Sequence, residues 1–545
     1  MGLYKEQEWS RKKGIILLVL SLLVIYMPWL CSERELFRQE SIYAVGAVEF
    51  SHPFFWVTAH GVPVYNAAPL FPGITALLSR LFQLPVEFVM RGISVFMLGA
   101  GAVLAYFAAA SQRTPKAGFV AAAFYASSFI AMEKGVEGNP ATMSACFLLA
   151  AQLLFFYYGM RKSNWNKAWL LSAFFLVLSF LSGGFLMLAC FIVPMFFFRR
   201  PLSVSSKFRS PGFVLAVVIL AAVVILWSVP YVMYFGDSLY DIWLDSVLFY
   251  KRRYLSDIVE FPLFFFLRLL PWSLIAWLPF CVALQDLDKT PIFSRYLRTL
   301  VFVSAVVIWF FSAGESRGLL YLTGPLAVLT GITYELGTRR YGQRIRKVLI
   351  CGEGVLAGLA LLILLVKFLP EKSIRLFASL SNSMAFRNEP GFLIQACCGC
   401  ALLLACSLLF HFWRKSRPLW FMLLLISAGC GIFYGTVVES YRAQVTGKRQ
   451  IGRVLRKALE TEKAERVYKM GINDLYGELF YAGIKAQKLR SVRELPRNEK
   501  VVYLIGTEFP GMAERSWTNL LPPGYAYNNH PLSLWKGVLR ETLDE

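Results

Sequence analysis

Acidic side chains gather between the first two long apolar segments of the chain. The stretch 32–78 carries four glutamates and then three other polar side chains: Glu33, Glu35, Glu40, Glu49, His60, Tyr65 and Asn66. A carboxylate can deprotonate a hydroxyl or amine, and the other groups can hydrogen-bond a polar substrate. Loops of this length are usually functional or disordered, and the aromatic residues at 50 and 54–56 argue against disorder. We therefore expect this stretch to form one wall of an active site.

The composition indicates the kind of protein in which this stretch lies. The 545 residues are 57% apolar and 17% charged, with a mean hydropathy of +0.54, values typical of an integral membrane protein. The net charge of +22 would suggest a nucleic-acid partner in a soluble protein. Here the basic residues cluster in short alternating loops, as the positive-inside rule requires. We therefore expect membrane lipids as partners, and no nucleic acid.

About thirteen apolar segments are long enough for membrane-spanning helices, because a span needs roughly 20 mostly apolar residues. We expect them at 14–31, 86–110, 117–133, 140–160, 167–182, 184–198, 212–235, 262–285, 298–313, 318–335, 347–368, 391–412 and 419–438. The two short segments on either side of Ser182–Gly184 could instead be one broken hairpin. No small-residue cleavage site follows the first segment, so we interpret it as a retained anchor.

The ten cysteines form no recognisable framework. Cys397, Cys398 and Cys400 lie in an apolar run without a histidine or carboxylate nearby, so packing is favoured over metal binding. We expect no metal ion and no cofactor.

Basic clusters set the expected orientation. Those at 5–13, 113–116, 161–167, 199–209, 339–347 and 414–417 share one side of the membrane if the N-terminus is cytoplasmic. The loops then expected on the outer side are 32–85, 134–139, 236–261, 314–317 and 369–390, with the tail from 439. Lys251, Arg252 and Arg253 break this rule, so they either bind a phosphate or form a patch that faces solvent or lipid headgroups.

The composition changes at the end of the last apolar segment. We treat 1–438 as a transmembrane domain, with 32–85 as its first outer loop, and 439–545 as a soluble domain. Ile451–Arg466 has the apolar spacing of a helix, and three short runs are typical of strands: 466–471, 479–483 and 500–506. This pattern predicts a small outer α/β domain that acts as a lid or docking domain.

Three functional classes suit a chain of this layout. A carrier would show internal repeats with broken helices at matching places, and a channel would show a polar stripe along its pore; the sequence has neither pattern. Acidic residues on the first outer loops and basic residues on the later ones favour an enzyme. That polarity suits a nucleophile that must be deprotonated and a phosphate leaving group that must be stabilised.

Motifs in the first outer loop resemble those of the GT-C polytopic glycosyltransferases, in the branch of protein mannosyltransferases and lipid A aminoarabinose transferases. Gln39–Ala44 corresponds to a DExxYA-type motif of that branch. Tyr65–Leu70 corresponds to its Y-x-E-K-P-P-L motif, and His60–Pro63 stands where the family often has N-G-x-P.

Later motifs extend the resemblance. Ser312–Tyr321, with Pro325 beyond it, is similar to a family S-x-S-K-x-x-x-Y-x-x-P stretch, and Leu270–Trp272 matches an L-P-W motif. The expected spans and the outer C-terminal domain match the layout of the aminoarabinose transferases. The resemblance therefore covers the whole chain, and it implies a GT-C-like membrane fold.

The first outer loop departs from the family at its catalytic position. The usual catalytic Asp falls on Gln39, which cannot act as a base, and Glu40 beside it becomes the candidate base. Alternatively, Glu40 only orients the loop and Glu33, Glu35 or Glu49 does the chemistry.

Two further family positions are changed. The phosphate-binding Lys falls on Ala68, and Arg317 with Arg252 or Arg253 could replace it, because guanidinium binds phosphate in bidentate fashion. The second family carboxylate falls on Asn139, which could bind substrate or cap the following helix.

The resemblance implies a glycosyltransferase that moves a sugar from a polyprenyl-phosphate donor to a lipid, protein or glycan acceptor, with inversion. Candidate substrate-binding residues are Gln39, Tyr43, Glu49, His60, Tyr65, Asn66, Glu137, Asn139, Arg252, Arg253, Glu315, Arg317 and Tyr321. We expect a monomer in a bacterial inner membrane, with the site and C-terminal domain periplasmic. The alternative is a non-catalytic or transport-type relative that binds or exports lipid-linked sugars.

Overall fold

A computed structural model describes most of the chain. The described residues are 10–30, 35–50, 57–64, 68–199, 202, 204–235, 254–312, 316–368, 418–434, 447–464, 466–472, 475–489, 491–496, 499–511, 514–522, 525–527 and 530–539. They divide into two compact units. Unit 1 comprises 1–32, 65–71 and 88–441, and unit 2 comprises 33–64, 72–87 and 442–545.

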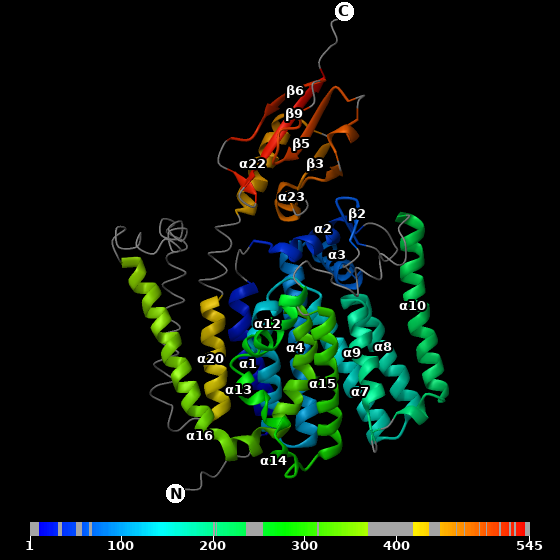
Figure 1. The fold of residues 1–545 in the computed structure, drawn as a ribbon, viewed down its shortest axis with the longest axis vertical. Helices are drawn as coiled ribbons and strands as arrows, with labels where there is room; N and C mark the ends of the chain where they lie inside the picture. Colours follow the sequence, from blue (N-terminus) through cyan, green and yellow to red (C-terminus); the bar gives the residue numbers. More distant parts are fainter. Residues whose placement is uncertain are drawn as a thin grey trace, which may run out of the picture. The chain divides into compact units, whose positions relative to one another are not determined.

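Unit 1 is a bundle of helices (Figure 1). Its longer helices are α1 (Arg11–Leu30), α4 (Val86–Gln112), α5 (Pro115–Ser127), α6 (Phe129–Gly135), α7 (Ala141–Phe155), α8 (Trp165–Gly183), α9 (Phe185–Phe197), α10 (Pro211–Phe235), α12 (Tyr254–Arg268), α15 (Pro291–Ser312), α16 (Leu319–Phe368) and α20 (Leu419–Phe433). Short elements join them: η1 (Phe156–Arg161), η2 (Ser205–Lys207), α13 (Ser273–Ala276), η3 (Leu278–Phe280), α14 (Val282–Gln285) and η4 (Ser316–Gly318).

Six helices of the described residues are long and apolar enough to cross a membrane, or seven if one bent pair counts as a span. The expected class, an α-helical membrane protein with a small C-terminal α/β region, is confirmed. The count of thirteen stays a prediction, and the expected span 391–412 lies outside the described residues.

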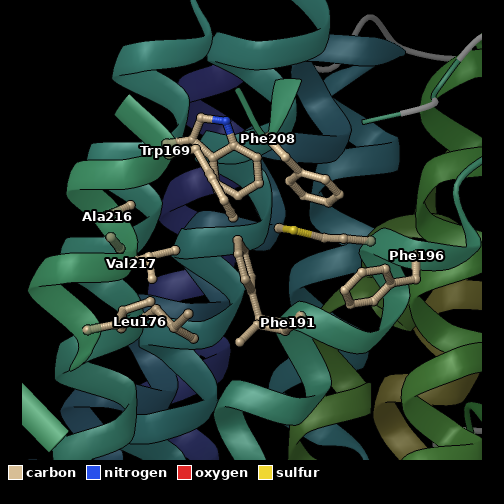
Figure 2. A pocket seen from close by; sticks show the side chains of 12 residues that line it. Trp169, Leu176, Phe191, Phe196, Phe208, Ala216 and Val217 are labelled. Atoms are coloured by element: carbon tan, nitrogen blue, oxygen red, sulfur yellow. The ribbon is translucent and has the colours of Figure 1, made fainter. Parts of the chain in front are cut away.

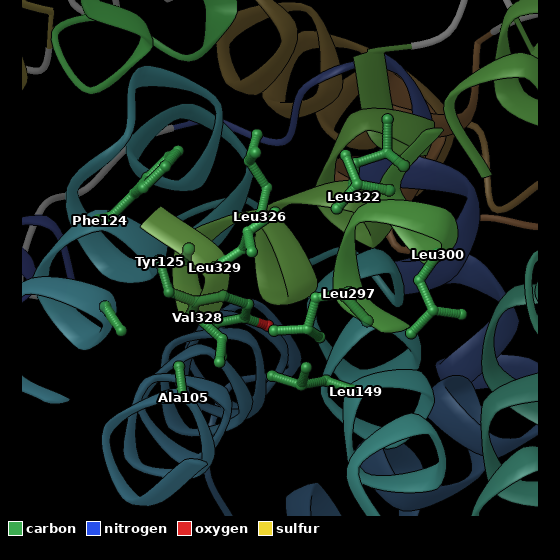
Figure 3. Packing of buried hydrophobic residues seen from close by; sticks show 14 of the residues in the cluster. Ala105, Phe124, Tyr125, Leu149, Leu297, Leu300, Leu322, Leu326, Val328 and Leu329 are labelled. Atoms are coloured by element: carbon green, nitrogen blue, oxygen red, sulfur yellow. The ribbon is translucent and has the colours of Figure 1, made fainter. Parts of the chain in front are cut away.

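Small residues let the central helices of unit 1 approach closely. A Cβ at Gly331 of α16 would lie 2.6 Å from the carbonyl oxygen of Ala117 in α5, and one at Gly118 would lie 2.6 Å from that of Tyr106. Leucines of α16 fill the space between α5 and α15 (Figure 3). This tight packing gives unit 1 one continuous apolar core.

Some expected spans have a different form. The segment 262–285 is not one helix, because α12 ends at Arg268 and the chain bends by 104° before α13. Pro271 lies in this bend, and a proline cannot donate the hydrogen bond that would continue a helix. The expected spans 318–335 and 347–368 belong to one helix, α16, since the basic residues between them are good helix formers.

Unit 2 combines part of the first loop with the C-terminal region. The loop contributes α2 (Arg38–Glu49), β1 (Thr58–Ala59), β2 (Val62–Pro63) and most of α3 (Leu70–Phe82). The C-terminal elements are α22 (Lys448–Thr461), β3 (Val467–Met470), α23 (Tyr476–Ala482), β4 (Ala486–Leu489), η7 (Val492–Glu494), β5 (Val501–Gly506), β6 (Arg515–Asn519), β7 (Ala526–Tyr527), β8 (His530–Pro531) and β9 (Ser533–Leu539). Within unit 2, α2 packs against α23.

The C-terminal sheet has the strand order β4-β3-β5-β9-β6. Strand β3 runs parallel to β4 and β5, whereas β9 is antiparallel to β5 and β6. The expected helix from Ile451 appears as α22, and the strands expected at 466–471 and 500–506 appear as β3 and β5. The strand expected at 479–483 is wrong: these residues end helix α23, which Gly483 closes at a φ of +70°.

Candidate functional site

Glu40, the candidate base, lies in the first turn of α2 and is 3% exposed. Its Oε2 accepts a hydrogen bond of 3.0 Å from the backbone N–H of Phe37, the residue that precedes the helix. A glutamate at this position supplies one half of a capping box. Glu40 therefore orients the start of α2, which is the alternative role that the sequence left open.

Glu49 stabilises a tight hairpin instead of standing free. Its carboxylate accepts hydrogen bonds from the backbone N–H groups of His60 and Gly61, at 3.1 and 3.2 Å, and from the Thr58 hydroxyl at 3.2 Å. His60 and Gly61 have φ values of 57° and 74°. Positive φ at both positions is typical of a two-residue type I′ turn between β1 and β2.

The His60 side chain is buried in unit 2, with 8% exposed. Its ring stacks on Tyr476 at 5.7 Å between centroids, and neither ring nitrogen has a hydrogen-bond partner among the described residues. The Lys469 ammonium lies 4.7 Å from the centroid of the same Tyr476 ring. Burial, together with the charges of Lys469 and Lys485, lowers the pKa of His60 to about 4. The imidazole is therefore neutral at pH 7.

A loop carboxylate, Glu35, and one at the start of α4, Glu87, bind the C-terminal helices within unit 2. Glu35 accepts hydrogen bonds from the backbone N–H groups of Lys448 and Arg449, at 3.0 and 2.9 Å, and so caps the start of α22. Glu87 binds the Tyr481 hydroxyl, and Arg449 lies 3.2 Å from its other oxygen. Burial raises the pKa of the Tyr481 phenol.

The remaining loop candidates occupy different environments. Gln39 is exposed on α2, whereas Tyr43 of the same helix is buried. Tyr65 and Asn66 lie outside the described residues, as does Glu33, the other alternative carboxylate.

A group of four charged side chains lies in unit 1, on α6, the segment after it and the end of α12; three of them are buried, and the fourth, Arg268, is half-buried. Lys134 Nζ lies 2.8 and 3.0 Å from the two carboxylate oxygens of Glu137, and 3.7 Å from Glu133 Oε1. Arg268 forms an ion pair with Glu133. We call these four residues the ion quartet. Its charges sum to zero, and each charged group lies beside one of opposite sign.

Aromatic rings position the arginine of the quartet. The Arg268 guanidinium lies 4.7 Å from the Phe264 ring centroid and 5.6 Å from that of Phe129. The backbone N–H of Phe129 donates to the Leu270 carbonyl at 3.0 Å. The start of α6 is thus tied to the bend after α12, and this tie holds Arg268 beside Glu133.

Asn139 forms a side-chain turn just before the helix that follows the quartet. Its side-chain oxygen accepts a 2.9 Å hydrogen bond from the Ala141 backbone N–H, and its own backbone N–H and carbonyl bond the Ser94 hydroxyl. The N-cap of α7 is Pro140, so Asn139 supports the start of the helix from one residue before the cap.

Two predicted residues of the later motif lie at the same end of unit 1. Arg317 belongs to η4, which packs against α6, and Tyr321 lies in the first turn of α16, 3.4 Å from the Ser144 hydroxyl. The structure therefore brings the elements of Glu137, Asn139, Arg317 and Tyr321 together. Arg252, Arg253 and Glu315 lie outside the described residues.

Lys134 and Arg268 were not predicted as site residues. Arg268 stands in the apolar run FFFLRLLPW, two residues before the L-P-W motif, and Lys134 stands between two glutamates. A cation in an apolar segment is a signal for a functional site or an internal ion pair. Pairing across more than 130 residues of sequence was not visible without the fold.

The arrangement in unit 1 offers two kinds of chemistry. Guanidinium and ammonium groups at the end of an apolar bundle can bind a phosphate oxygen that arrives from the lipid. The two carboxylates can bind sugar hydroxyls or accept a proton. Among the described residues, no group of three histidine, cysteine or carboxylate side chains is placed to hold a metal ion.

Comparisons with known proteins agree with this layout. The family model of dolichyl-phosphate-mannose-protein mannosyltransferases matches residues 66–229, which include Glu133, Lys134, Glu137 and Asn139. Among solved structures, the chain is similar to ArnT from Cupriavidus metallidurans bound to undecaprenyl phosphate, with a TM-score of 0.69 and 14% identity over 97% of this chain and 98% of that one. The chain has the fold of the GT-C glycosyltransferases.

The GT-C fold confirms the resemblance predicted from the sequence motifs. The apo form of the same ArnT gives a TM-score of 0.67, again with 14% identity and the same coverage of both chains. A sequence comparison with curated proteins gives no match. The similarity is therefore one of fold, over nearly the full length of both chains.

Proposed function

We propose that the chain is a membrane glycosyltransferase that takes its sugar from a polyprenyl-phosphate donor. The observation that carries the proposal is the full-length GT-C fold, shared with an ArnT that was solved with undecaprenyl phosphate. The matched mannosyltransferase family model supports the same class of donor. We place the reaction on the periplasmic face of a bacterial inner membrane, opposite the basic loops.

Arg268 and Arg317 bind the donor phosphate in this proposal. Both lie on elements that pack against α6, at the end of unit 1 opposite the basic loops. Arginine suits a phosphate because its planar fork binds two oxygens at once. Lys134 supplies a third cation. Arg252 or Arg253, which the sequence predicts as a phosphate-binding residue, supplies a further one. The family Lys that Ala68 replaces is then not needed.

Glu40 is the proposed base, on the strength of its motif position. The acceptor hydroxyl or amine loses its proton to the carboxylate and attacks the anomeric carbon. A new bond forms from that carbon to the acceptor, and its bond to the phosphate oxygen breaks with inversion. Polyprenyl phosphate leaves with the electron pair, and the arginines stabilise its charge.

A turnover assay tests this function. Purified full-length protein in liposomes is given undecaprenyl phosphate carrying a radiolabelled hexose or pentose, together with membrane lipid, protein and glycan acceptors. We expect labelled acceptor and an equal amount of free undecaprenyl phosphate. Movement of the intact labelled lipid between leaflets, without release of undecaprenyl phosphate, would instead support the transport-type alternative. If neither occurs with any donor, the proposal is wrong.

A further inference from the structure

Helices α8, α9 and α10 enclose an apolar cavity of about 310 Å³ in unit 1. Figure 2 shows Leu176, Ala216 and Val217 on one side of it, and Phe196 and Phe208 on the other. Its lining is apolar throughout, and its volume reaches the lower limit of small-molecule sites. The cavity is therefore suited to a hydrocarbon chain.

Small side chains keep this cavity open. Ala173 of α8 and Ala216 of α10 both line it, although the two helices pack closely near their start. There, a Cβ at Gly212 would lie 2.5 Å from the Asn166 Cα, and the Gly212 N–H donates to the Asn166 side chain. The helices are joined at this point, and the alanines leave space beyond it.

The cavity opens on the surface of unit 1. Phe196 is 70% exposed and Val217 is 45% exposed, although both line the cavity. Among the long apolar helices, α10 is the least buried. An empty apolar cavity forfeits dispersion contacts, so in a membrane this opening admits an acyl chain from the surrounding lipid.

Aromatic rings lie at one end of the cavity. The Trp169 ring lies 4.8 Å from that of Phe213 and 5.9 Å from that of Phe208, which in turn lies 6.0 Å from Phe196. These residues belong to the start of α8, the segment before α10, the start of α10 and the end of α9. Aromatic residues gather in this way at a membrane–water interface.

The same end of the helices carries strong positive charge. Residues 138–236 contain seven Lys or Arg and no Asp or Glu, and the seven fall at 161–167 and 199–209. Lys207 and Arg209 flank Phe208, which lines the cavity. Arg209 is exposed, and Lys207 Nζ lies 5.6 Å from the Trp165 ring centroid. A chain in the cavity would therefore place its headgroup beside cations.

We propose that this cavity binds one acyl chain of an anionic phospholipid, with the headgroup phosphate at Lys207 and Arg209. The ion quartet lies at the other end of unit 1: it precedes α7, and 21 helical residues from Ala141 to Arg161 separate it from this basic end, a rise of about 30 Å. The phospholipid site is thus separate from the proposed donor-phosphate site, on the opposite side of the membrane.

Native mass spectrometry of the detergent-purified full-length protein tests the proposal. Phosphatidylglycerol, phosphatidylcholine and undecaprenyl phosphate are titrated separately. We expect one phosphatidylglycerol to bind in preference to phosphatidylcholine. Ala216→Phe, which fills the cavity, should weaken that binding at least tenfold. Ala221→Phe, on an exposed position of the same helix, is the matched control and should bind as the wild type does.

A second pair of variants tests the headgroup independently of the cavity. Lys207→Gln with Arg209→Gln should reduce phosphatidylglycerol affinity by about 25-fold, roughly fivefold for each cation. Phosphatidylcholine affinity should fall by less, because its choline ammonium already offsets the charge of its phosphate. Arg344→Gln, an exposed change on α16, is the control.

Three results would overturn the proposal. The first is unchanged phosphatidylglycerol binding in a folded Ala216→Phe protein, and the second is equal binding of all three lipids to the wild type. The third is an Ala216→Phe protein that loses undecaprenyl phosphate binding but keeps phosphatidylglycerol binding. If Ala216→Phe does not fold, Ala173→Phe fills the cavity from α8, and the exposed charge variants still decide the headgroup site.

Discussion

At the scale of single residues, the acids of the first loop that the structure describes all make structural contacts. Glu35 caps α22, Glu40 caps α2 and Glu49 holds the β1–β2 turn. Such contacts do not exclude chemistry, because a carboxylate has two oxygens and several acceptor sites. They mean that a loss of activity in an alanine variant alone would not identify a base.

Glu40 offers a substitution that separates the two roles. Glutamine also serves at this position of a capping box, so Glu40→Gln should keep α2 and the folded protein but lose the charge needed to accept a proton. We expect transfer to fall by at least 100-fold. Glu40→Ala should lose transfer and also about 1 kcal/mol of stability. Transfer near the wild-type rate in Glu40→Gln membranes would place the base elsewhere.

Arg268 should contribute to both donor binding and stability. Arg268→Ala removes a phosphate ligand and leaves Glu133 without this partner, so we expect at least tenfold weaker binding of undecaprenyl phosphate and a loss of about 3 kcal/mol. Adding Glu133→Gln should restore stability but not binding. Native mass spectrometry and thermal unfolding measure the two effects. Arg298→Ala breaks an ion pair with Asp288 instead, and this control should leave undecaprenyl phosphate binding unchanged. If binding is also unchanged in Arg268→Ala, Arg268 is not a phosphate ligand.

His60 should make unit 2 sensitive to acid. The unfolded imidazole takes up its proton near pH 6.5 and the folded one near pH 4, so the unfolded state binds more protons between these values. The contribution of the neutral His60 to the free energy of unfolding is fully present above pH 6.5. It falls by up to about 3 kcal/mol as the pH is lowered toward 4. His60→Asn suits the positive φ and should reduce the drop in melting temperature between pH 7.5 and pH 5. An equal drop in wild type and variant would show that His60 does not cause it.

At the scale of elements, apolar runs predicted most helices of unit 1 but not their breaks or joins. The apolar run 262–285 predicts one span, although Pro271 interrupts it. The basic residues at 339–347 predict a break between two spans, although they continue helix α16. The run 479–483 has strand-like composition, yet α23 forms because it packs on α2 and α22. The ion quartet could not be predicted from local patterns, because it forms between segments that are distant in the sequence.

The Glu35 cap joins the first loop to α22 within unit 2. Its carboxylate satisfies two N–H groups that a helix leaves without internal partners, and Gly447 before the helix has no side chain to do so. Glu35→Ala should cost about 1 kcal/mol and speed amide exchange of Lys448 and Arg449 by about fivefold. Hydrogen–deuterium exchange measures this rate. The exposed Glu460, at the other end of α22, supplies a control variant, and equal exchange in Glu35→Ala and wild type would contradict the cap.

At the scale of the whole molecule, unit 1 has two chemically different ends. One carries the basic loops, the aromatic residues around Trp169 and the apolar cavity. The other carries the ion quartet, the bend after α12 and η4 with Arg317. This asymmetry fits an enzyme that takes a lipid-linked substrate from the membrane and reacts at one face only. The sequence predicted the basic end from composition, and the fold was needed to identify the cations at the other.

The most direct test of the donor site is a structure of the full-length protein with undecaprenyl phosphate bound. We predict the phosphate at the ion-quartet end of unit 1, with oxygens about 2.7–3.2 Å from the Arg268 and Arg317 guanidinium groups. A phosphate bound away from both arginines, or beside Lys207 and Arg209 at the opposite end, would contradict it.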